Sequence, residues 1–318
     1  MVSKGYRKRG CGVVLLKRVK NPIRLAREML IRGEVDGGGG GNGGGDGDPA
    51  GGAGGAQGHC VLGGPTLEAL AEEWGLDMVD EEYFWTKKRW NEHKRGLKGE
   101  AEGEYLPQGT VGCVALDRYG TVCVATSTGG LTNKLSGRIG DTPTIGAGFW
   151  AEEWEVQRAT IYKQPQVRAP IALMLPDGVK QVLGECLPGL AGYFGLLENE
   201  CDEKSSSTTI RAIAVSGTGN GDSFLRLAAA RTAGALARFS PNRSLSSAVT
   251  QIAGPGGELQ QSAGDRWGKG GEGEGGIIGI EMVEGVGKVV CDFNCGGMFR
   301  CWVDDKGRER VMVFKEEY

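Results

Sequence analysis

Alternating apolar and small residues predict a β-hairpin within residues 109–128. Residues 111–116 (VGCVAL) and 121–126 (TVCVAT) are rich in β-branched and small apolar residues, and residues 117–120 (DRYG) have the composition of a turn. If the two strands pair symmetrically about this turn, the numbers of facing residues sum to about 237 or 238. Thr128 then lies opposite Thr110 or one residue away, so two hydroxyl groups meet at the open end of the hairpin.

Two amphipathic helices are predicted before the hairpin, with a short strand at 59–62 between them. The first covers residues 21–33, because Asn21-Pro22 is a favourable helix start and Gly33 a helix stop. The second covers residues 65–74. The apolar positions along one face are Ile23, Ala26, Met29 and Leu30 in the first helix and Leu67, Leu70, Ala71 and Trp74 in the second. Both helices are expected to face a core.

The region after the hairpin mixes strands and helices. Strands are predicted at 210–215, 277–282, 288–293, 298–303 and 310–314, and helices at 223–238 and 245–252. The last four strands are expected to form a β-meander that packs against the hairpin. Residues 154–180 show mixed spacing without a motif, and 195–208 are expected to form a polar loop. These elements together predict an α+β fold.

Two segments of low complexity interrupt this pattern. Residues 36–58 contain 14 glycines and no apolar residue larger than alanine, so we expect a disordered surface insertion. A phosphate-binding glycine loop is the alternative, but the segment lacks the GK[ST] ending of that motif. Residues 86–109 are charged and glycine-containing and are expected to form an exposed linker, the kind of segment at which a chain is cut.

Composition excludes some functional classes. The formal net charge of −3 and a pI near 5.7 do not favour nucleic acid or an anionic membrane as partners. The nine cysteines include no CxxC pair and are expected to be buried, reduced thiols. The apolar run at 13–16 is too short for a signal peptide or a membrane span, so a soluble cytoplasmic protein is expected. His59 and His93 are the only histidines, which gives little support for a His-based metal site or a serine triad.

Thr110 is a candidate nucleophile. It follows Gly109 in a polar approach segment, and a cut between the two residues would give Thr110 a free α-amino group beside its hydroxyl. An α-amine has an ordinary pKa of about 7.7–8.0 and can therefore accept the hydroxyl proton near neutral pH. Nucleophile and base would then lie on one residue.

Five short segments in and after the hairpin occur in a recognisable order. They are Thr110-Val111-Gly112, Thr126-Ser127-Thr128-Gly129-Gly130, Asn133-Lys134, Gly137-Arg138-Ile139-Gly140-Asp141 and Gly146-Ala147-Gly148. In this order they resemble the plant-type asparaginase/isoaspartyl peptidase family of N-terminal-nucleophile (Ntn) hydrolases. The similarity continues through most of residues 110–318 and, more weakly, through 19–33 and 59–90. The resemblance implies a four-layer αββα sandwich, a single domain split into two chains by self-cleavage.

The resemblance also assigns roles to residues. It implies cleavage between Gly109 and Thr110, which gives an α subunit of residues 1–109 and a β subunit of residues 110–318. Thr110 would be the nucleophile, Thr128 would orient it, and Thr218 and Gly219 would stabilise the oxyanion. The implied substrate-binding residues are Arg138, which would take an α-carboxylate, Asp141, which would take an α-ammonium, and Gly219 and Gly221.

Two of these segments allow other readings from their residues alone. Arg138 and Asp141 could form only a local surface ion pair, because such pairs are common. The GxGxG spacing of residues 217–221 could belong to a nucleotide site, although the third glycine of the dinucleotide motif is missing. An oxyanion hole is the alternative, since glycine permits close approach of the backbone.

The expected function is hydrolysis of β-aspartyl amides, either isoaspartyl peptides or L-asparagine, by an enzyme without a metal or organic cofactor. The implied partners are a small-molecule or peptide substrate and further copies of the processed pair in a homo-oligomer. A threonine endoprotease of the same superfamily is an alternative. A third reading is an inactive relative, because the sequence contains neither the His-Gly-Gly-Ala-like motif nor the Asn-Ala-Gly segment of the family's N-terminal part.

Overall fold

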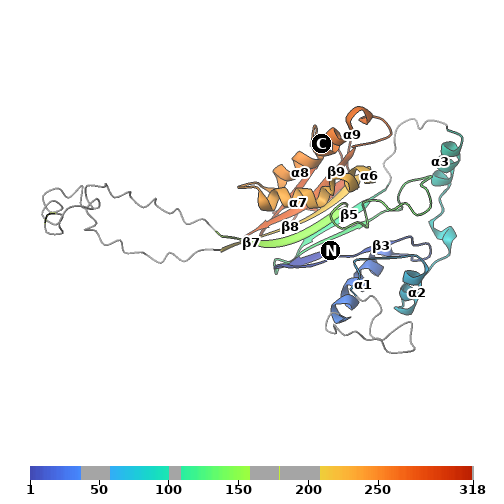
Figure 1. Ribbon diagram of the computed structural model, residues 1–318, viewed down its shortest axis with the longest axis horizontal. Helices are drawn as coiled ribbons and strands as arrows, with labels where there is room; N and C mark the ends of the chain where they lie inside the picture. Colours follow the sequence, from blue (N-terminus) through green and yellow to red (C-terminus); the bar gives the residue numbers. More distant parts are fainter. Residues whose placement is uncertain (37–57, 100–108, 158–178, 180–207, 317–318) are drawn as a thin grey trace. The chain divides into compact units, whose positions relative to one another are not determined.

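The computed structural model describes residues 1–36, 58–99, 109–157, 179 and 208–316 (Figure 1). The chain divides into two compact units, one formed by Met1–Trp154 with Ile210–Tyr318 and the other by Glu155–Thr209. Most of the second unit lies outside the described residues, as does most of the predicted insertion 36–58 and the predicted loop 195–208. The first unit mixes helices with β-sheets, so the structure is α+β.

The predicted hairpin forms one half of the first sheet. The sheet has the strand order β2 (Arg7–Arg9), β1 (Val2–Lys4), β6 (Val122–Ser127) and β5 (Val111–Leu116). Strands β5 and β6 are antiparallel, and their facing residues sum to 238, as for Val111 and Ser127. The turn closes on Asp117, whose Oδ1 accepts from the backbone N–H groups of Tyr119 and Thr121, both at 2.8 Å. The hairpin prediction is confirmed.

The second sheet contains most of the strands predicted after the hairpin. Its order is β10 (Val286–Phe293), β9 (Gly275–Val283), β8 (Thr208–Gly219) and β7 (Phe149–Gln157). The last two strands, β11 (Arg300–Val303) and β12 (Glu309–Met312), pair only with each other among the described strands. The predicted four-strand meander therefore exists as two separate antiparallel pairs.

The two sheets pack face to face, through even-numbered residues in β5, β6, β8 and β9 and odd-numbered residues in β7. Val122 and Val124 of β6 share one buried hydrophobic cluster with Ala212 and Ala214 of β8 and with Met282 of β9. Because successive strand residues point to opposite faces, the other even-numbered residues of these strands point into the same interface. The two threonines at the open end of the hairpin, also even-numbered, follow this inner face.

Helices pack on the outer face of the second sheet. The helices of this region are α6 (Gly221–Leu227), α7 (Ala229–Phe239), α8 (Leu245–Ala253) and α9 (Glu258–Ala263). In Figure 1, α7 and α8 lie along β8 and β9. A Cβ added at Gly234 of α7 would lie 3.0 Å from Ile213 of β8, and one at Gly279 would lie 3.1 Å from Leu245. These odd-numbered positions face the helices, so α7 and α8 cover part of the outer face of the second sheet.

The single helix predicted at 223–238 is wrong, because the structure breaks it at Ala228. This residue has a left-handed backbone (φ 46°) and separates α6 from α7. The first N–H groups of α7, on Ala230 and Arg231, donate to the backbone carbonyls of Ala147 and Gly146 at 3.1 and 2.7 Å. Hydrogen bonds to a distant loop thus replace bonds that a continuous helix would make within itself.

The N-terminal residues form a smaller layer with its own core. Helices α1 (Pro22–Asp36) and α2 (Pro65–Glu73) confirm the two predicted helices and flank the parallel pair β3 (Gly12–Val14) and β4 (Val61–Gly63). Leu25, Met29 and Leu67 are among its most buried side chains. Strands β1, β2 and β3 were not predicted, because the basic start of the chain shows no alternation. They form because they pair with neighbouring strands, β1 with β2 and β6, and β3 with β4. The Met1 α-amine donates to Val124 O at 2.7 Å.

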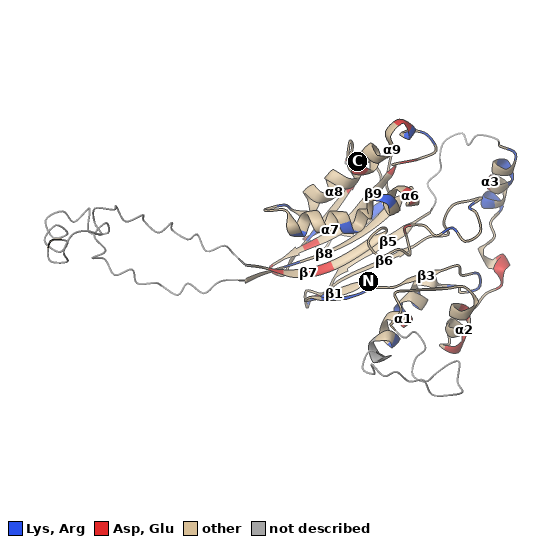
Figure 2. Ribbon diagram, viewed as in Figure 1, with Lys and Arg blue, Asp and Glu red and all other residues tan. Residues whose placement is uncertain are grey.

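The predicted linker 86–109 is not irregular throughout. A short 3-10 turn (Glu81–Phe84) leads into helix α3 (Lys87–Leu97), and residues 100–108 lie outside the description. Thr86 caps α3 by accepting from Arg89 N at 3.3 Å, and the basic residues of its last turn, Lys94 and Arg95, favour a helix C-terminus. Figure 2 shows the basic residues of this helix. The high glycine and charge content of residues 86–109 led to the prediction of a linker, although Thr86 and the basic last turn are helix signals.

The cysteines are less buried than expected. Of the seven described cysteines, all free thiols, Cys11 is buried, whereas Cys60, Cys113, Cys291 and Cys301 are exposed. Cys113 lies on the outer face of β5, an edge strand that the described residues leave open on that face. Burial raises the pKa of the Cys11 thiol to about 11. The expectation of buried thiols therefore holds for only part of the set.

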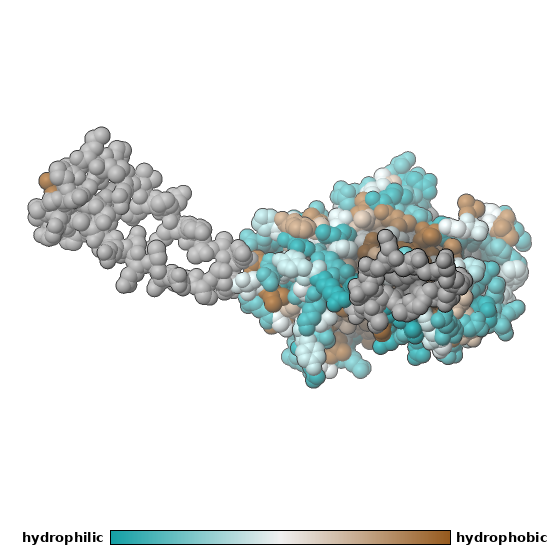
Figure 3. All heavy atoms as spheres, turned by 60° about the horizontal axis from the view of Figure 1, so that its bottom comes forward, coloured by the Kyte–Doolittle hydropathy of each residue, from teal (hydrophilic) through white to brown (hydrophobic). Residues whose placement is uncertain are grey.

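The described surface is mainly polar on the face drawn in Figure 3, where hydrophobic residues gather in separate patches. In the part of the chain that the structure describes, we find no helix that combines the length and the apolar character needed to cross a membrane.

Candidate functional site

Thr110 and Thr128 meet at the open end of the hairpin. The Thr110 hydroxyl donates to Thr128 Oγ1 at 3.3 Å, and Gly130 N donates to the same Oγ1 at 3.1 Å. The register that pairs Val111 with Ser127 places these two threonines directly opposite each other, one position beyond the ladder. Thr110 is half-buried and Thr128 exposed. A hydroxyl pair of this kind can hold one oxygen in a fixed orientation beside open solvent.

A second hydroxyl pair lies one layer deeper between the sheets. Thr126 Oγ1 and Ser216 Oγ are 2.8 Å apart and join β6 to β8. The approach is close because Gly112 has no side chain, and a Cβ there would lie 2.2 Å from Ser216 Oγ. Ser216 is 2% exposed. The pair therefore fixes the spacing of the two sheets directly below Thr110 and Thr128.

The strand directions place Thr218 at the same end of the interface. Gly112 contacts Ser216, whereas Leu116 lies against Gly287, which pairs with Met282 and thus lies farther along the second sheet. Moving from Gly112 back to the start of β5 therefore corresponds to moving from Ser216 forward along β8. Two residues along each strand, on the same inner faces, are Thr110 and Thr218. The structure thus brings the third threonine predicted to be catalytic to the same end of the two packed sheets as Thr110.

The strand predicted at residues 210–215 extends farther than predicted, through Gly219. Ser216 to Gly219 continue β8 and pair with β9, Gly219 opposite Gly275. Gly219 has φ +149°, and a Cβ there would lie 2.3 Å from Glu274 O. The glycine is thus required by close approach of the neighbouring backbone. Helix α6 starts only after Asn220, whose side chain caps it by accepting from Ser223 N at 3.0 Å.

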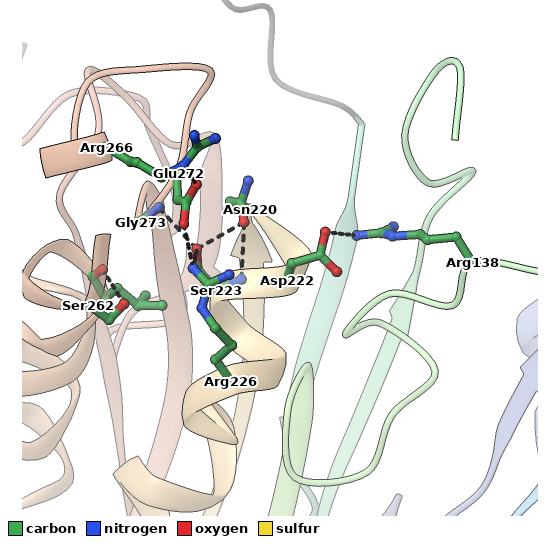
Figure 4. A network of polar contacts seen from close by, with 10 residues as sticks. Arg138, Asn220, Asp222, Ser223, Arg226, Ser262, Arg266, Glu272 and Gly273 are labelled. Atoms are coloured by element: carbon green, nitrogen blue, oxygen red, sulfur yellow. Dashed lines mark hydrogen bonds and ion pairs between the residues drawn. The ribbon is translucent and has the colours of Figure 1, made fainter. Parts of the chain in front are cut away.

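Arg138 pairs with an aspartate that the sequence did not single out. Its Nη2 donates to Asp222 Oδ2 at 3.1 Å, from the loop after the hairpin to the first turn of α6. Figure 4 shows the two side chains pointing toward each other. Among the described residues, Arg138 Nε is buried without a hydrogen-bond partner. The local pair between Arg138 and Asp141 is therefore not the ion pair that the structure contains.

Asp141 lies beside this pair in a buried position. It is 7% exposed, and burial raises the pKa of its carboxyl to about 6. The nearby Asp222 carboxylate raises this pKa further, whereas the backbone N–H groups of Asp141 and Thr142 and the Arg138 guanidinium lower it. Two carboxylates and one guanidinium thus share one corner. A bound ammonium group would offset the excess of negative charge there.

Gly221 forms the contact between helix α6 and this corner. A Cβ added at Gly221 would lie 2.5 Å from Asp141 Oδ1 and 3.1 Å from Arg138 Nη2. The glycine therefore lets the start of α6 approach both charged side chains. Gly221 and Gly219, both predicted as substrate-binding residues, are brought to the same end of β8 by the structure.

A second polar network holds the other side of α6 (Figure 4). Glu272 accepts from Arg226 Nη2 at 2.8 Å and also pairs with Arg266. Ser223, which is fully buried, accepts from Gly273 N at 3.0 Å. These bonds connect α6 to the loop before β9, so the helix that carries Asp222 is fixed from both sides.

A cavity of about 700 Å³ adjoins this region on the outer face of the first sheet. Helix α1 and strand β3 line one side, and β6 with the following loop lines the other. Thr128 and Arg138 lie on its wall. The cavity therefore borders two of the predicted site residues.

The described residues hold no cluster of three or more His, Cys, Asp or Glu side chains with the geometry of a metal site. His59 is exposed, and His93 contacts Asn133 rather than acidic or sulfur ligands.

Sequence reasoning missed two residues of this site, Ser216 and Asp222. Both lie next to predicted residues along the chain, in the motif that contains Thr218 and Gly219. The even-number parity shared by Thr126, Thr128 and Thr218 was a signal that could have indicated Ser216. Asp222 gave no such signal, because its partner Arg138 lies 84 residues away.

Comparisons with known proteins agree with the order of motifs. Residues 55–157 match the Asparaginase_2 family model, described as asparaginase. The chain is 36% identical over 160 residues to an isoaspartyl peptidase of Escherichia coli (strain K12), which covers 44% of this chain and 50% of the relative. It is 45% identical over 98 residues to an isoaspartyl peptidase/L-asparaginase of Mus musculus, or 30% of each chain.

A plant relative is also similar. The chain is 31% identical over 194 residues to a protein of Arabidopsis thaliana named as a probable isoaspartyl peptidase/L-asparaginase, over 52% of each chain. This chain spans about half the length of the bacterial relatives that it matches. The residues that match the family model include the hairpin with Thr110 and Thr128, so over this part the chain is similar to asparaginases and isoaspartyl peptidases.

Proposed function

We propose that this protein is an Ntn amidohydrolase that cleaves β-aspartyl amides after cutting its own chain between Gly109 and Thr110. The observation that carries the proposal is the hydrogen bond between Thr110 and Thr128, at the start of a strand and at an open end of the two packed sheets. The names of the relatives, isoaspartyl peptidase and L-asparaginase, support the reaction class.

Self-cleavage needs only the Thr110 hydroxyl and the carbonyl before it. Oγ1 attacks the Gly109 carbonyl carbon, the peptide C–N bond breaks, and the proton of the hydroxyl ends on the departing nitrogen. Water then hydrolyses the resulting ester to a Gly109 carboxylate and a free Thr110 hydroxyl. Gly109 has φ +22°, a backbone conformation that favours glycine.

In the processed enzyme the Thr110 α-amine becomes the base. It takes the hydroxyl proton as Oγ1 attacks the side-chain amide carbonyl, and returns it to the leaving amine, ammonia from asparagine or the α-amine of the next residue from an isoaspartyl peptide. Thr128 orients Oγ1, and Thr218 and Gly219 stabilise the oxyanion. Water completes the cycle by hydrolysing the acyl-enzyme ester to aspartate.

The charged corner binds the amino-acid end of the substrate. Arg138 receives the α-carboxylate through its guanidinium, whose buried Nε supports a ligand contact. Asp141 receives the α-ammonium, which offsets the negative charge concentrated there. Gly219 and Gly221 keep this space clear of side chains.

The finer architecture follows from the same proposal. Residues 1–109 and 110–318 form the two chains of one domain with a four-layer αββα arrangement, which is supported by α1 outside the first sheet and α7 and α8 outside the second. The processed pairs assemble into a homo-oligomer, and no cofactor takes part. The seven described free thiols support a reducing, cytoplasmic location.

A denaturing gel tests the proposal. Purified protein should separate into fragments of 109 and 209 residues, the second beginning at Thr110 by N-terminal sequencing. Thr110→Ala should stay a single band and release no ammonia from L-asparagine, because nucleophile and base are lost together. Thr110→Ser is the matched control and should keep both reactions at reduced rates. Turnover by Thr110→Ala would disprove the mechanism.

Substrate assays separate the alternatives. Release of ammonia from L-asparagine, or of free amino acid from an isoaspartyl dipeptide, supports the proposal. Cleavage of a folded protein substrate without either release would identify a threonine endoprotease. A full-length band without turnover after prolonged incubation would identify an inactive relative.

A further inference from the structure

Helix α3 (Lys87–Leu97) lies close to the predicted cleavage site although neither the fold prediction nor the proposed function uses it. It belongs to the segment that ends at Gly109, and its helical form is supported by the Thr86 cap. Its contacts reach both members of the threonine pair through their neighbours in sequence. One end contacts the loop that follows Thr128, and the other lies near the residue that precedes Thr110.

The first set of contacts joins α3 to Asn133. Asn133 Nδ2 donates to His93 O at 3.3 Å, and its Oδ1 contacts His93 Nδ1. Gly96 makes this approach feasible, because a Cβ there would lie only 2.0 Å from Asn133 Nδ2. Asn133 itself has a left-handed backbone (φ 57°), which fixes the direction of its side chain. Glycine inside a helix is less stable than alanine. Gly96 therefore lowers the stability of α3 but permits the close approach of Asn133.

The second contact brings a cation to Gly109. Arg89 Nη2 lies 4.0 Å from the position that a Cβ of Gly109 would occupy. The other terminal nitrogen, Nη1, donates to Glu92 Oε2 at 2.8 Å, one helical turn away. Glu92 is 6% exposed, so Arg89 is held by a buried carboxylate rather than by a mobile one. One terminal nitrogen of this restrained guanidinium therefore lies beside Gly109.

We propose that α3 is a positioning element for self-cleavage, in which Gly96 and Asn133 dock the helix and Arg89 holds the Gly109 peptide against Thr110. This inference rests on the proposed self-cleavage and adds residues to it. The attack of Thr110 Oγ1 places negative charge on the Gly109 carbonyl oxygen. A cation fixed nearby stabilises the transition state that carries this charge, and so lowers the activation free energy of cleavage. Cleavage frees Gly109 from Thr110, so Arg89 has no part in the later hydrolysis of β-aspartyl amides.

Two substitutions test the two contacts separately. Arg89→Ala removes the cation, and Gly96→Ala strengthens the helix while pushing it away from Asn133. Each should slow the appearance of the 209-residue fragment at least tenfold when the full chain is made by cell-free synthesis and sampled over time on denaturing gels. Arg95→Ala is the matched control, because it removes the same charge from an exposed position of the same helix and should process at the wild-type rate.

Two further measurements distinguish positioning from a general loss of structure. Arg89→Lys should recover part of the processing rate, and thermal melting of all variants should stay within about 2 °C of wild type. Turnover of L-asparagine per mole of exposed Thr110 N-terminus should stay within twofold of wild type in Arg89→Ala, since the cation acts before that reaction.

The outcomes separate this inference from the proposed function. A wild-type chain that never cleaves defeats the self-cleavage itself. Cleavage of wild type together with unchanged rates in Arg89→Ala and Gly96→Ala overturns only the role of α3. An equal loss of processing and of turnover per exposed Thr110 would assign Arg89 a structural role and also overturn the inference.

Discussion

Two clusters of arginine and carboxylate differ in how completely their charges are paired. Glu152 is fully buried, and its two oxygens accept from Arg231 at 3.4 Å and from Arg238 at 2.8 Å. Asp141, also buried, lies beside an Arg138 guanidinium that pairs with Asp222 instead, and burial raises the pKa of its carboxyl to about 6. One cluster is satisfied by its own residues, and the other is left with unbalanced charge. Fully paired charges are typical of structural ion pairs, whereas unbalanced buried charges are typical of ligand-binding sites.

The surroundings of the two clusters deepen the contrast. The arginines around Glu152 stack on aromatic rings, Arg231 at 4.9 Å from the Trp150 centroid and Arg238 at 5.0 Å from that of Phe239. Within the part of the chain that the structure describes, no aromatic ring packs on the Arg138–Asp222 pair, and the Asp222 side chain is 53% exposed at the start of α6. A substrate could displace or share the Asp222 contact with Arg138, whereas Glu152 is fully buried and already paired with two arginines.

The largest effect is expected from Glu152→Ala. It leaves two partly buried guanidinium groups without their carboxylate, and the free energy of unfolding should fall by about 3–5 kcal/mol. Urea denaturation followed by circular dichroism measures the loss. Glu153→Ala, one residue along the strand and on its opposite face, is the control and should cost less than about 1 kcal/mol. Turnover per folded molecule of Glu152→Ala should match wild type. Loss of turnover without loss of stability would show that Glu152, rather than being structural, takes part in the reaction.

Asp141→Asn should give the opposite combination, a more stable protein without substrate binding. A carboxyl whose pKa is raised in the folded state favours folding when protonated, so its contribution is present below about pH 4 and is lost as pH rises through about 6. The substitution should therefore add up to about 3 kcal/mol at pH 7 and nearly nothing at pH 4. Denaturation at both pH values measures this. An equal gain in stability at pH 4 and pH 7 would show that the gain does not arise from the titration of Asp141.

The smallest effect is expected from Asp222→Asn, which keeps the shape of the side chain but removes its charge. KM for L-asparagine should change threefold to tenfold, about 1 kcal/mol, with kcat nearly unchanged, because Asp222 orients Arg138 rather than the reacting atoms. The pKa of Asp141 should fall, and the acid limb of kcat/KM should move to lower pH. Asp222→Glu is the conservative control. An unmoved acid limb would show that the two carboxylates do not interact.

The sequence allowed the centre of the site to be predicted, because that centre depends on local pairing. The turn at residues 117–120 sets the register, and the register places Thr110 opposite Thr128. The resemblance then indicated Arg138, Asp141 and Thr218, whose roles remain predictions. Local pattern was also sufficient for α1, α2 and α8, whose apolar spacing predicted the helices that the structure contains.

Features that depend on distant partners could not be predicted. Ala228 breaks a helix whose pattern is continuous, because the loop at Gly146 and Ala147 offers carbonyl groups to the new N-terminus. Strand β1 exists because it pairs with β6, not because residues 2–4 favour a strand. Asp222 enters the charged corner because packing of α6 brings it to Arg138. In each case the deciding contact joins segments that are far apart in the sequence.

The pairing of β1 with β6 has a consequence for any break before Thr110. Val2 and Ser3 on one side of the break share backbone hydrogen bonds with Cys123 and Val122 on the other. The two pieces would therefore behave as complementing fragments that hold a common sheet together without a covalent link. Pulling them apart under native conditions would expose the edge of β6, so the separated halves should be far less soluble than the joined pair.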